Sequence, residues 1–189
     1  MQTETLTVTA QDAAPLFVRK WTPDSDDVKA VVQILHGMAE HTARYARLAE
    51  ALTNCGYAVI AHDQRGHGKT ARTPADLGYF ADQAGWEKIL SDVYCINHLA
   101  RRTWVQKPII VLGHSMGSFV LQSYITHYGN TMQAAIFSGT DGKVGAAMRQ
   151  VALSIIQMNT LWYGARNKSK FTRAISFGAF NKPFKPNRT

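Results

Sequence analysis

The sequence predicts an α/β fold with a doubly wound, mainly parallel sheet. Short apolar segments rich in β-branched residues alternate with longer segments of helical periodicity through the first 140 residues. Hydrophobic residues make up 46% of the chain and charged residues 18%, which is typical of globular proteins. Because a chain of 189 residues buries roughly 70% of its unfolded surface, we expect a sizeable core.

Two strands open the predicted series, at Thr5–Ala10 and Leu16–Trp21, and a loop ending at Pro15 joins them. The β-branched run Lys29–Leu35 follows as a buried strand. The next segment, Arg44–Cys55, carries its apolar residues on one helical face and stops at a glycine, so it is predicted to be a helix.

The second half of the series continues the alternation. Tyr57–Ala61 reads as a short buried strand, and apolar residues at helical spacing predict a long helix at Trp86–Ala100. A strand at Ile109–Leu112, a helix at Met116–Tyr128 and a strand at Ala134–Ser138 complete it. Helices of this length between buried strands indicate parallel crossovers.

The formal charge of +8 comes from the tail of the chain. All 13 acidic residues lie at or before Asp141, whereas residues 142–189 carry nine basic ones and no acidic one. The first 141 residues therefore have a formal charge of −1. No nucleic-acid-binding motif accompanies the basic tail, so we expect no nucleic-acid partner.

Other features favour a cytoplasmic protein. Cys55 and Cys95 lack CxxC-type spacing and are expected to be buried, unpaired thiols. The first residues have neither a basic flank nor a long apolar run, so no secretory signal is expected. No apolar stretch approaches the roughly 20 residues of a membrane-spanning helix.

Gly113-His114-Ser115-Met116-Gly117 forms a G-x-S-x-G motif between a predicted strand and a predicted helix, the setting of a nucleophile elbow. Ser115 is expected to have a strained backbone and to project its hydroxyl above the sheet, while the two glycines let strand and helix approach closely. The Met116 N–H, at the helix N-terminus, then points toward a developing oxyanion. The alternative is an ordinary turn that holds serine and glycine by chance.

His36-Gly37-Met38 directly follows the strand Lys29–Leu35. In a fold with this elbow, the second oxyanion donor comes from the loop after that strand, so we assign it to the backbone N–H of Met38. His36 and Gly37 are expected to support the loop, with His36 structural rather than an acid or a base.

These motifs resemble a known family. HGMAEHTARY (36–45), DQRGHGKT (63–70) and GHSMGS (113–118) look like the monoacylglycerol lipase and lysophospholipase branch of the α/β-hydrolases, often grouped with serine aminopeptidases. The resemblance covers most of residues 16–140 and implies the α/β-hydrolase fold. It also implies hydrolysis of a carboxylic ester, commonly a glycerolipid or lysophospholipid with one acyl chain, without a metal or cofactor.

Charged residues in these motifs are expected to be structural. Asp63 and Arg65 are predicted to pin a glycine-bent loop beside the active site through hydrogen bonds. Glu40 and His41 are predicted to shape the oxyanion loop.

The residues that would activate Ser115 are incomplete. In this fold the order along the chain is Ser, then Asp or Glu, then His. After Ser115 the sequence offers only His127 and Asp141, in the wrong order, and His127 lies about 18 Å down the predicted helix. We therefore expect a fold truncated after the strand Ala134–Ser138 and a chain inactive alone. A non-catalytic remnant, or a site completed by a second chain, are the alternatives.

The predicted domains are 1–142, the N-terminal part of the hydrolase core, and 143–189, part of a helical cap. An apolar stripe at helical spacing, including Val151, Ile155 and Trp162, lies beside basic residues where the family inserts a cap. Such a segment can cover an acyl-chain pocket and make peripheral contact with an anionic membrane. The alternative is a core helix with solvated basic residues.

The sequence thus predicts a serine hydrolase of carboxylic esters that acts on a small acyl ester or lysolipid through an acyl-enzyme on Ser115. Two alternatives stay open: a serine aminopeptidase, and a lipid-binding or interaction domain that does not turn over its ligand.

Overall fold

The structure, a computed structural model, describes residues 1–25, 27–142, 145–164 and 166. The chain divides into two compact units, Met1–Asp141 and Gly142–Thr189, and each is described by itself. The first unit contains the sheet and the motifs identified above.

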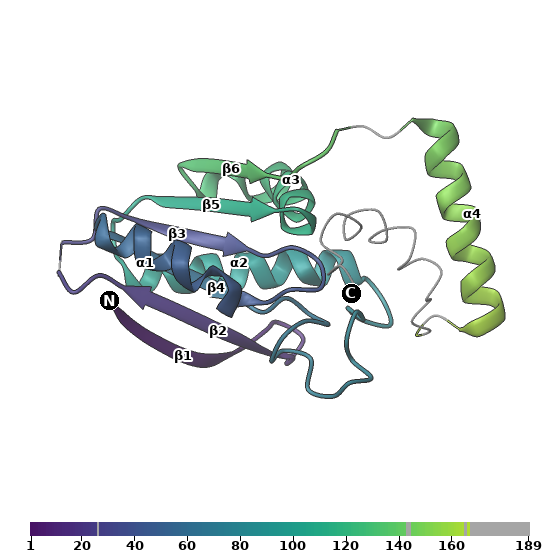
Figure 1. Ribbon diagram of the computed structural model, residues 1–189, viewed down its shortest axis with the longest axis horizontal. Coiled ribbons are helices and arrows are strands. Elements are labelled where there is room, and N and C mark those ends of the chain that lie inside the picture. Colours follow the sequence, from purple (N-terminus) through teal and green to yellow (C-terminus); the bar gives the residue numbers. More distant parts are fainter. Residues whose placement is uncertain (26, 143–144, 165, 167–189) are drawn as a thin grey trace, which may run out of the picture. The chain divides into compact units, whose positions relative to one another are not determined.

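Six strands form one mixed sheet in the order β1-β2-β4-β3-β5-β6 (Figure 1). In chain order they are β1 (Gln2–Thr9), β2 (Pro15–Thr22), β3 (Ala30–Leu35), β4 (Tyr57–His62), β5 (Ile109–His114) and β6 (Ala134–Ser138). β1 and β2 form an antiparallel pair at one edge, and the other four strands run parallel to one another. The predicted mainly parallel sheet is confirmed.

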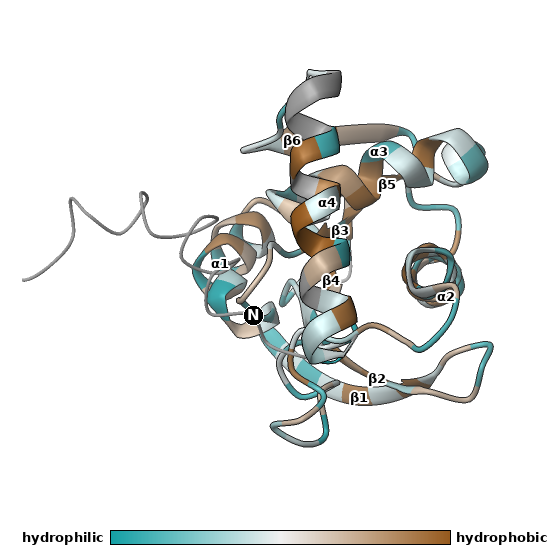
Figure 2. Cartoon of the chain, turned by 90° about the vertical axis from the view of Figure 1, so that its right-hand side faces the viewer, coloured by the Kyte–Doolittle hydropathy of each residue, from teal (hydrophilic) through white to brown (hydrophobic). Residues whose placement is uncertain are grey.

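Helices cover both faces of this sheet. In chain order they are the 3-10 turn η1 (Thr42–Tyr45), α1 (Ala46–Asn54), α2 (Gly85–Thr103), α3 (Met116–Tyr128) and the 3-10 turn η2 (Gly129–Thr131). α1 lies on one face, and α2 and α3 lie on the other (Figures 1 and 2). The change of face between α1 and α2 follows from right-handed crossovers that run in opposite directions along the sheet.

The central parallel strands β3, β4 and β5 are mostly apolar and buried, because both of their faces pack against helices. On the α1 side, Val32, Ile34 and Val59 pack with Ala49. The intervening strand residues, including Leu35, face the core under α2 and α3. This period of two makes each parallel strand a continuous apolar run.

Two details differ from the sequence predictions. The segment predicted as one helix from Arg44 begins as a 3-10 turn and becomes α-helical only at Ala46. Cys55 was expected to be buried and is exposed, because it caps α1 where the chain turns at the surface. Cys95 is half-buried, and both thiols are free.

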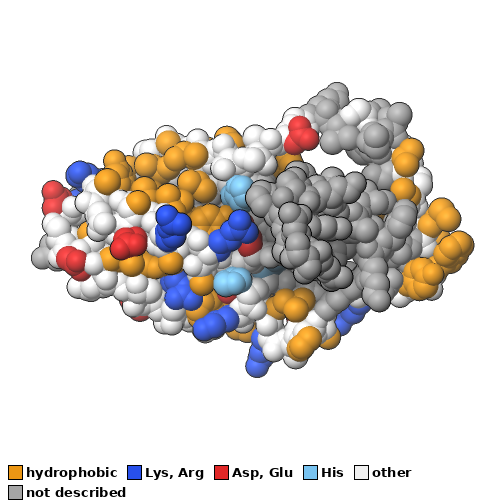
Figure 3. Space-filling view, viewed as in Figure 1, with side chains coloured by type: hydrophobic (Ala, Val, Ile, Leu, Met, Phe, Trp, Pro, Cys, Tyr) orange, Lys and Arg blue, Asp and Glu red, His pale blue; other side chains and the backbone are white. Residues whose placement is uncertain are grey.

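β6 forms the sheet edge opposite to β1, as expected for a sheet that ends at this strand. Ile136 and Phe137 on β6 are 46% and 41% exposed. Figure 3 shows hydrophobic side chains at the surface over β5 and β6 on the face that carries α1. Within the described residues, no strand pairs with the outer side of β6.

The described part of the second unit is mainly one helix, α4 (Ala146–Tyr163), where the apolar stripe predicted one. The basic residues Lys168, Lys170, Arg173, Lys182, Lys185 and Arg188 lie outside the described residues, and so does the proposed basic membrane contact. Within the described ranges, every helix is too short or too polar to span a bilayer.

Candidate active site

The candidate site lies at the carboxyl ends of β3 and β5. From β3 the chain moves to β4, which is the neighbour of β3 on one side within the sheet, and then crosses to β5, the neighbour of β3 on the other side. Loops after β3 and β5 therefore diverge at this point, which is where open α/β sheets bind ligands. The parallel register sets Leu35 opposite Gly113, so the loop beginning at His36 lies beside the loop that carries Ser115.

Ser115 has the strained conformation expected of the elbow, with φ 50° and ψ −118°. Neighbouring groups hold it there: its N–H donates to the Ser138 carbonyl at 2.9 Å. Its carbonyl accepts from the N–H and the hydroxyl of Ser118 at 2.8 and 2.6 Å. Among the described residues, no partner bonds to the Ser115 hydroxyl.

The two motif glycines allow β3, β5 and α3 to meet at this turn. A Cβ on Gly113 would lie 2.5 Å from the carbonyl oxygen of Gly117. A Cβ on Gly117 would lie 2.1 Å from the carbonyl oxygen of Leu35 at the end of β3. Since both obstacles are backbone atoms, no side-chain rearrangement relieves the clash. Glycine at both positions therefore lets β3, β5 and α3 approach one another closely.

The loop after β3 lies against the nucleophile. A Cβ on Gly37 would lie 3.2 Å from the Ser115 Cβ and 3.4 Å from the His114 ring. Met116 is the first residue of α3, where N–H groups lack intrahelical partners. Within the described residues, neither the Met38 nor the Met116 N–H donates to a protein group. In the described part of the chain both N–H groups assigned as oxyanion donors are thus unpaired, and Met38 is 52% exposed.

His36 bonds to neighbouring backbone groups through both ring nitrogens. Its Nε2 accepts from the Gln64 N–H at 2.9 Å, so its Nδ1, 2.7 Å from the Gly37 carbonyl, carries the ring proton. Burial lowers the pKa of His36 to about 4. Both ring nitrogens are engaged and the ring is neutral, so His36 has no free nitrogen for the Ser115 proton.

The DQRGHGKT loop is pinned by its charged residues, as predicted. Asp63 accepts from the Thr42 and Lys69 N–H groups, each at 2.8 Å. Arg65 makes paired hydrogen bonds to Asp92 on α2, at 2.6 and 2.8 Å, and to Asp12 between β1 and β2, at 2.8 and 2.7 Å. Asp63 and Arg65 are therefore engaged in structural contacts rather than open to a substrate.

Acid is expected to destabilise the fold through its buried histidines. Burial lowers the pKa of both His36 and His62 to about 4, against an ordinary value of 6.5. Between these values the unfolded chain binds protons that the folded chain does not, so the free energy of unfolding falls as the pH drops from 6.5 to 4. At about pH 4.5, each of these histidines lowers the free energy of unfolding by roughly 2 kcal/mol relative to about pH 7.

Urea unfolding at about pH 7 and about pH 4.5 measures this loss. The His62→Leu variant should show a smaller difference between the two midpoints, because leucine does not bind a proton. The variant should still fold, since among the described residues no hydrogen bond to the His62 ring is lost. Equal midpoints for the wild-type chain at the two pH values would contradict the assignment.

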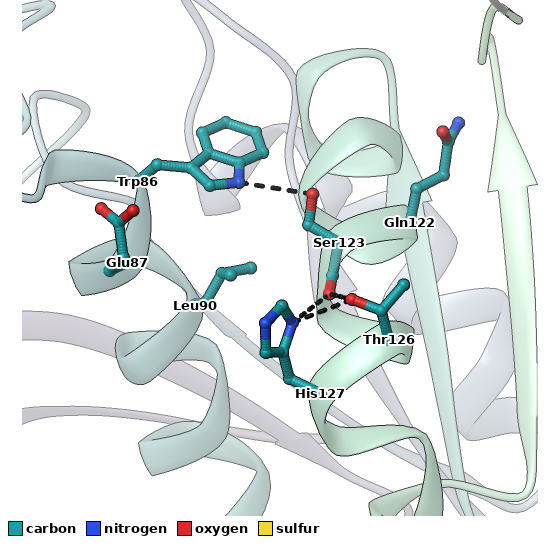
Figure 4. Close-up of a pocket in the computed structure, with 7 residues that line it drawn as sticks. All are labelled: Trp86, Glu87, Leu90, Gln122, Ser123, Thr126 and His127. Atoms are coloured by element: carbon teal, nitrogen blue, oxygen red, sulfur yellow. Dashed lines mark hydrogen bonds between the residues drawn. The ribbon is translucent and has the colours of Figure 1, made fainter.

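His127 and Asp141 are not brought to Ser115 by a hydrogen bond in the described structure. The Nδ1 of His127 contacts the Thr126 hydroxyl at 2.8 Å and the Ser123 carbonyl at 3.0 Å, both on its own helix. It lines a cavity of about 330 Å³ between α2 and α3, where Trp86 donates to the Ser123 hydroxyl (Figure 4). None of the predicted site residues lines this cavity.

Sequence reasoning missed three residues that shape the site. Ser118 and Ser138 hold the two sides of the Ser115 backbone, and Gln64 contacts both the ring and the carbonyl of His36. Ser118 lies in the quoted GHSMGS motif, three residues beyond the nucleophile, where its hydroxyl can reach back one turn. Gln64 and Ser138 carry no comparable local signal, because their roles depend on strands that are adjacent only in the folded chain.

Comparisons with known proteins identify the family of the chain. The family described as serine aminopeptidase, S33, matches residues 26–179. A monoacylglycerol lipase of Mycolicibacterium smegmatis is 34% identical over 63% of this chain and 40% of its own length. A monoglyceride lipase of Mus musculus is 35% identical over 58% of this chain and 34% of its own length. The chain therefore spans well under half of the length of these curated relatives.

A solved structure shows the same fold. A thermostable carboxyl esterase from Bacillus coagulans, in complex with glycerol, superposes with a TM-score of 0.80 at 23% sequence identity, covering 100% of this chain and 60% of that one. The α/β-hydrolase fold predicted from the motifs is confirmed. With the family match extending over most of its residues, the chain belongs to the serine aminopeptidase S33 family of α/β-hydrolases.

Proposed function

We propose that the protein is a serine hydrolase of carboxylic esters, with Ser115 as the nucleophile. One observation carries the proposal: Ser115 has φ 50° and ψ −118° on a strand–turn–helix elbow at the switch point of the sheet. Among the described residues, the backbone N–H groups of Met38, in the loop after β3, and of Met116, at the start of α3, have no protein partner. A strained serine beside unpaired donors is the arrangement that acyl transfer requires.

In the proposed reaction, the Ser115 oxygen attacks the ester carbonyl carbon and loses its proton to a base. The carbonyl oxygen becomes an oxyanion, which accepts hydrogen bonds from Met38 and Met116. The C–O bond to the alcohol then breaks, the alcohol leaves with a proton, and an acyl-enzyme remains on Ser115. Water attacks this ester in the same way and releases the carboxylic acid.

The base is the incomplete part of this site. Serine is a weak nucleophile until a histidine accepts its proton. No described histidine ring bonds to the Ser115 hydroxyl, and no histidine follows His127 in the sequence. We therefore expect this chain alone to reach at most the roughly 10³–10⁴-fold acceleration that an oxyanion hole and binding supply without the triad.

Relatives named for monoacylglycerol and monoglyceride substrates support a lipid ester with one acyl chain as the substrate. The second candidate is hydrolysis of aminoacyl amides, which the family's description favours. A third reading is binding of a monoacyl lipid without turnover at the same site.

A comparison of three substrates separates these functions. We expect slow, Ser115-dependent release of fatty acid from a monoacylglycerol and of p-nitrophenol from a short acyl ester, with no product from an aminoacyl p-nitroanilide. The Ser115→Ala variant should lose both ester activities and keep its fold. Faster cleavage of the anilide would favour the aminopeptidase, and lipid binding without any Ser115-dependent product would favour the binding domain.

A further inference from the structure

We propose that Glu40, His36 and Gln64 are positioning residues that fix the two peptide groups flanking Gly37, and so present the Met38 N–H as the donor of the oxyanion loop. This inference rests on the proposed function of Ser115. Its evidence, however, is the hydrogen bonding of the loop, which can be measured without any activity.

The first peptide group, between His36 and Gly37, is held at both ends. The His36 carbonyl accepts from the side-chain amide of Gln64 at 2.6 Å. The Gly37 N–H donates to the Glu40 carboxylate. Gln64 is fully buried, and only its amide nitrogen can face a carbonyl oxygen, so the orientation of this side chain is fixed.

The second peptide group, between Gly37 and Met38, is held at one end. The Gly37 carbonyl accepts from the His36 Nδ1–H at 2.7 Å. In a trans peptide the N–H points away from the carbonyl, so this bond also sets the direction of the Met38 N–H. Of the four polar atoms in the two groups, three are bound by buried side chains. The Met38 N–H is the fourth and has no partner within the described structure.

Glu40 is suited to this role because its charge is compensated. Its carboxylate is 5% exposed and accepts from the Tyr45 hydroxyl at 2.7 Å on the oxygen that binds Gly37. The other oxygen lies 3.1 Å from the Arg44 guanidinium. Charge-assisted bonds of this kind are short and directional. They hold the carboxylate in place and reduce its repulsion of an oxyanion nearby.

The hydrogen bonds from Glu40, His36 and Gln64 to the two peptide groups are called the clamp below. Amide NMR of the full chain tests the clamp directly. We expect the Gly37 N–H to be protected from solvent exchange, and the Met38 N–H to exchange faster. Glu40→Ala should remove the protection of Gly37 and shift the Met38 resonance. Glu40→Gln should preserve both, because the glutamine oxygen still accepts from Gly37. Glu50→Ala removes an exposed carboxylate on α1 and is the matched control. Unchanged Gly37 and Met38 resonances in Glu40→Ala would overturn the inference.

The rate of Ser115 labelling by a fluorophosphonate, which phosphonylates activated serines, gives the functional readout. We expect a loss of about 10²-fold in Glu40→Ala, as for a misplaced oxyanion donor, and recovery of most of the rate in Glu40→Gln. If Glu40→Ala does not fold, Gln64→Ala tests the other end of the first peptide group by the same readouts.

The two proposals fail differently. A wild-type chain that is never labelled but has the expected Gly37 and Met38 exchange would contradict the proposed function and support the clamp. Equal labelling of Glu40→Ala and Glu40→Gln, with a folded protein in both cases, would overturn the clamp and leave Ser115 as the nucleophile.

Discussion

Gly117→Ala is expected to destabilise the chain strongly. The added Cβ would lie 2.1 Å from the Leu35 carbonyl oxygen and 2.8 Å from that of His36. Both are backbone atoms at the end of the central strand β3, so relief requires α3 to move away from the sheet. We expect a loss of more than about 4 kcal/mol in the free energy of unfolding, beyond the usual cost of overpacking. Urea unfolding followed by circular dichroism measures it.

Gly129→Ala is the matched control for this substitution. Gly129 has a helical φ of −57°, and its Cβ would meet only the Ile125 side chain at an ordinary 3.6 Å. Alanine there should be neutral or stabilise the chain by about 0.4–1 kcal/mol. Similar unfolding midpoints for the two variants would show that α3 does not pack against β3 as closely as described.

The second large effect is expected at Arg65. Its guanidinium pairs with Asp92, whose side chain is fully buried, and with Asp12, whose side chain is 31% exposed. Arg65→Leu would leave the Asp92 carboxylate buried without a partner, at a cost of about 3–5 kcal/mol. The substitution should also release the DQRGHGKT loop from α2 and from the β1–β2 turn.

A double variant distinguishes this mechanism from simple loss of packing. Arg65→Leu with Asp92→Leu removes the stranded charge, so it should recover much of the stability lost in the single variant. Glu4→Gln, which breaks the pair between Lys20 and the exposed Glu4, should cost less than about 1 kcal/mol. A double variant less stable than Arg65→Leu alone would contradict the account.

The sequence predicts the strands and helices of the first unit well because each one has a clear period. On β3, Val32 and Ile34 face α1, and they alternate with residues that face α2 and α3. The apolar positions at helical spacing end at local signals such as Gly56 after α1. The elbow is recognised locally, since its motif occupies five consecutive residues between a strand and a helix, although Ser138 and Leu35, which constrain Ser115 and Gly117, come from other strands. Burial of Cys55 was wrongly predicted, because periodicity does not show where a helix end meets the surface.

The rest of the site depends on which strands are neighbours. Gln64 follows β4 and His36 follows β3, and they meet because these strands pair in parallel. Arg65 joins residues 27 and 53 positions away, which no local pattern indicates. For the same reason, the unpaired Met38 N–H can be assigned from the family motif, but its fixed direction emerges only from the folded loop.

The most direct test of Ser115 as the nucleophile is mass mapping of a fluorophosphonate adduct, with and without added imidazole as an external base. We expect a single adduct on Ser115 that forms slowly alone, forms faster with imidazole, and is absent from Ser115→Ala. Adducts spread over several serines, or an equal yield from Ser115→Ala, would contradict Ser115 as the nucleophile. Fast, stoichiometric labelling without imidazole would contradict the expectation that this chain alone lacks a base for Ser115.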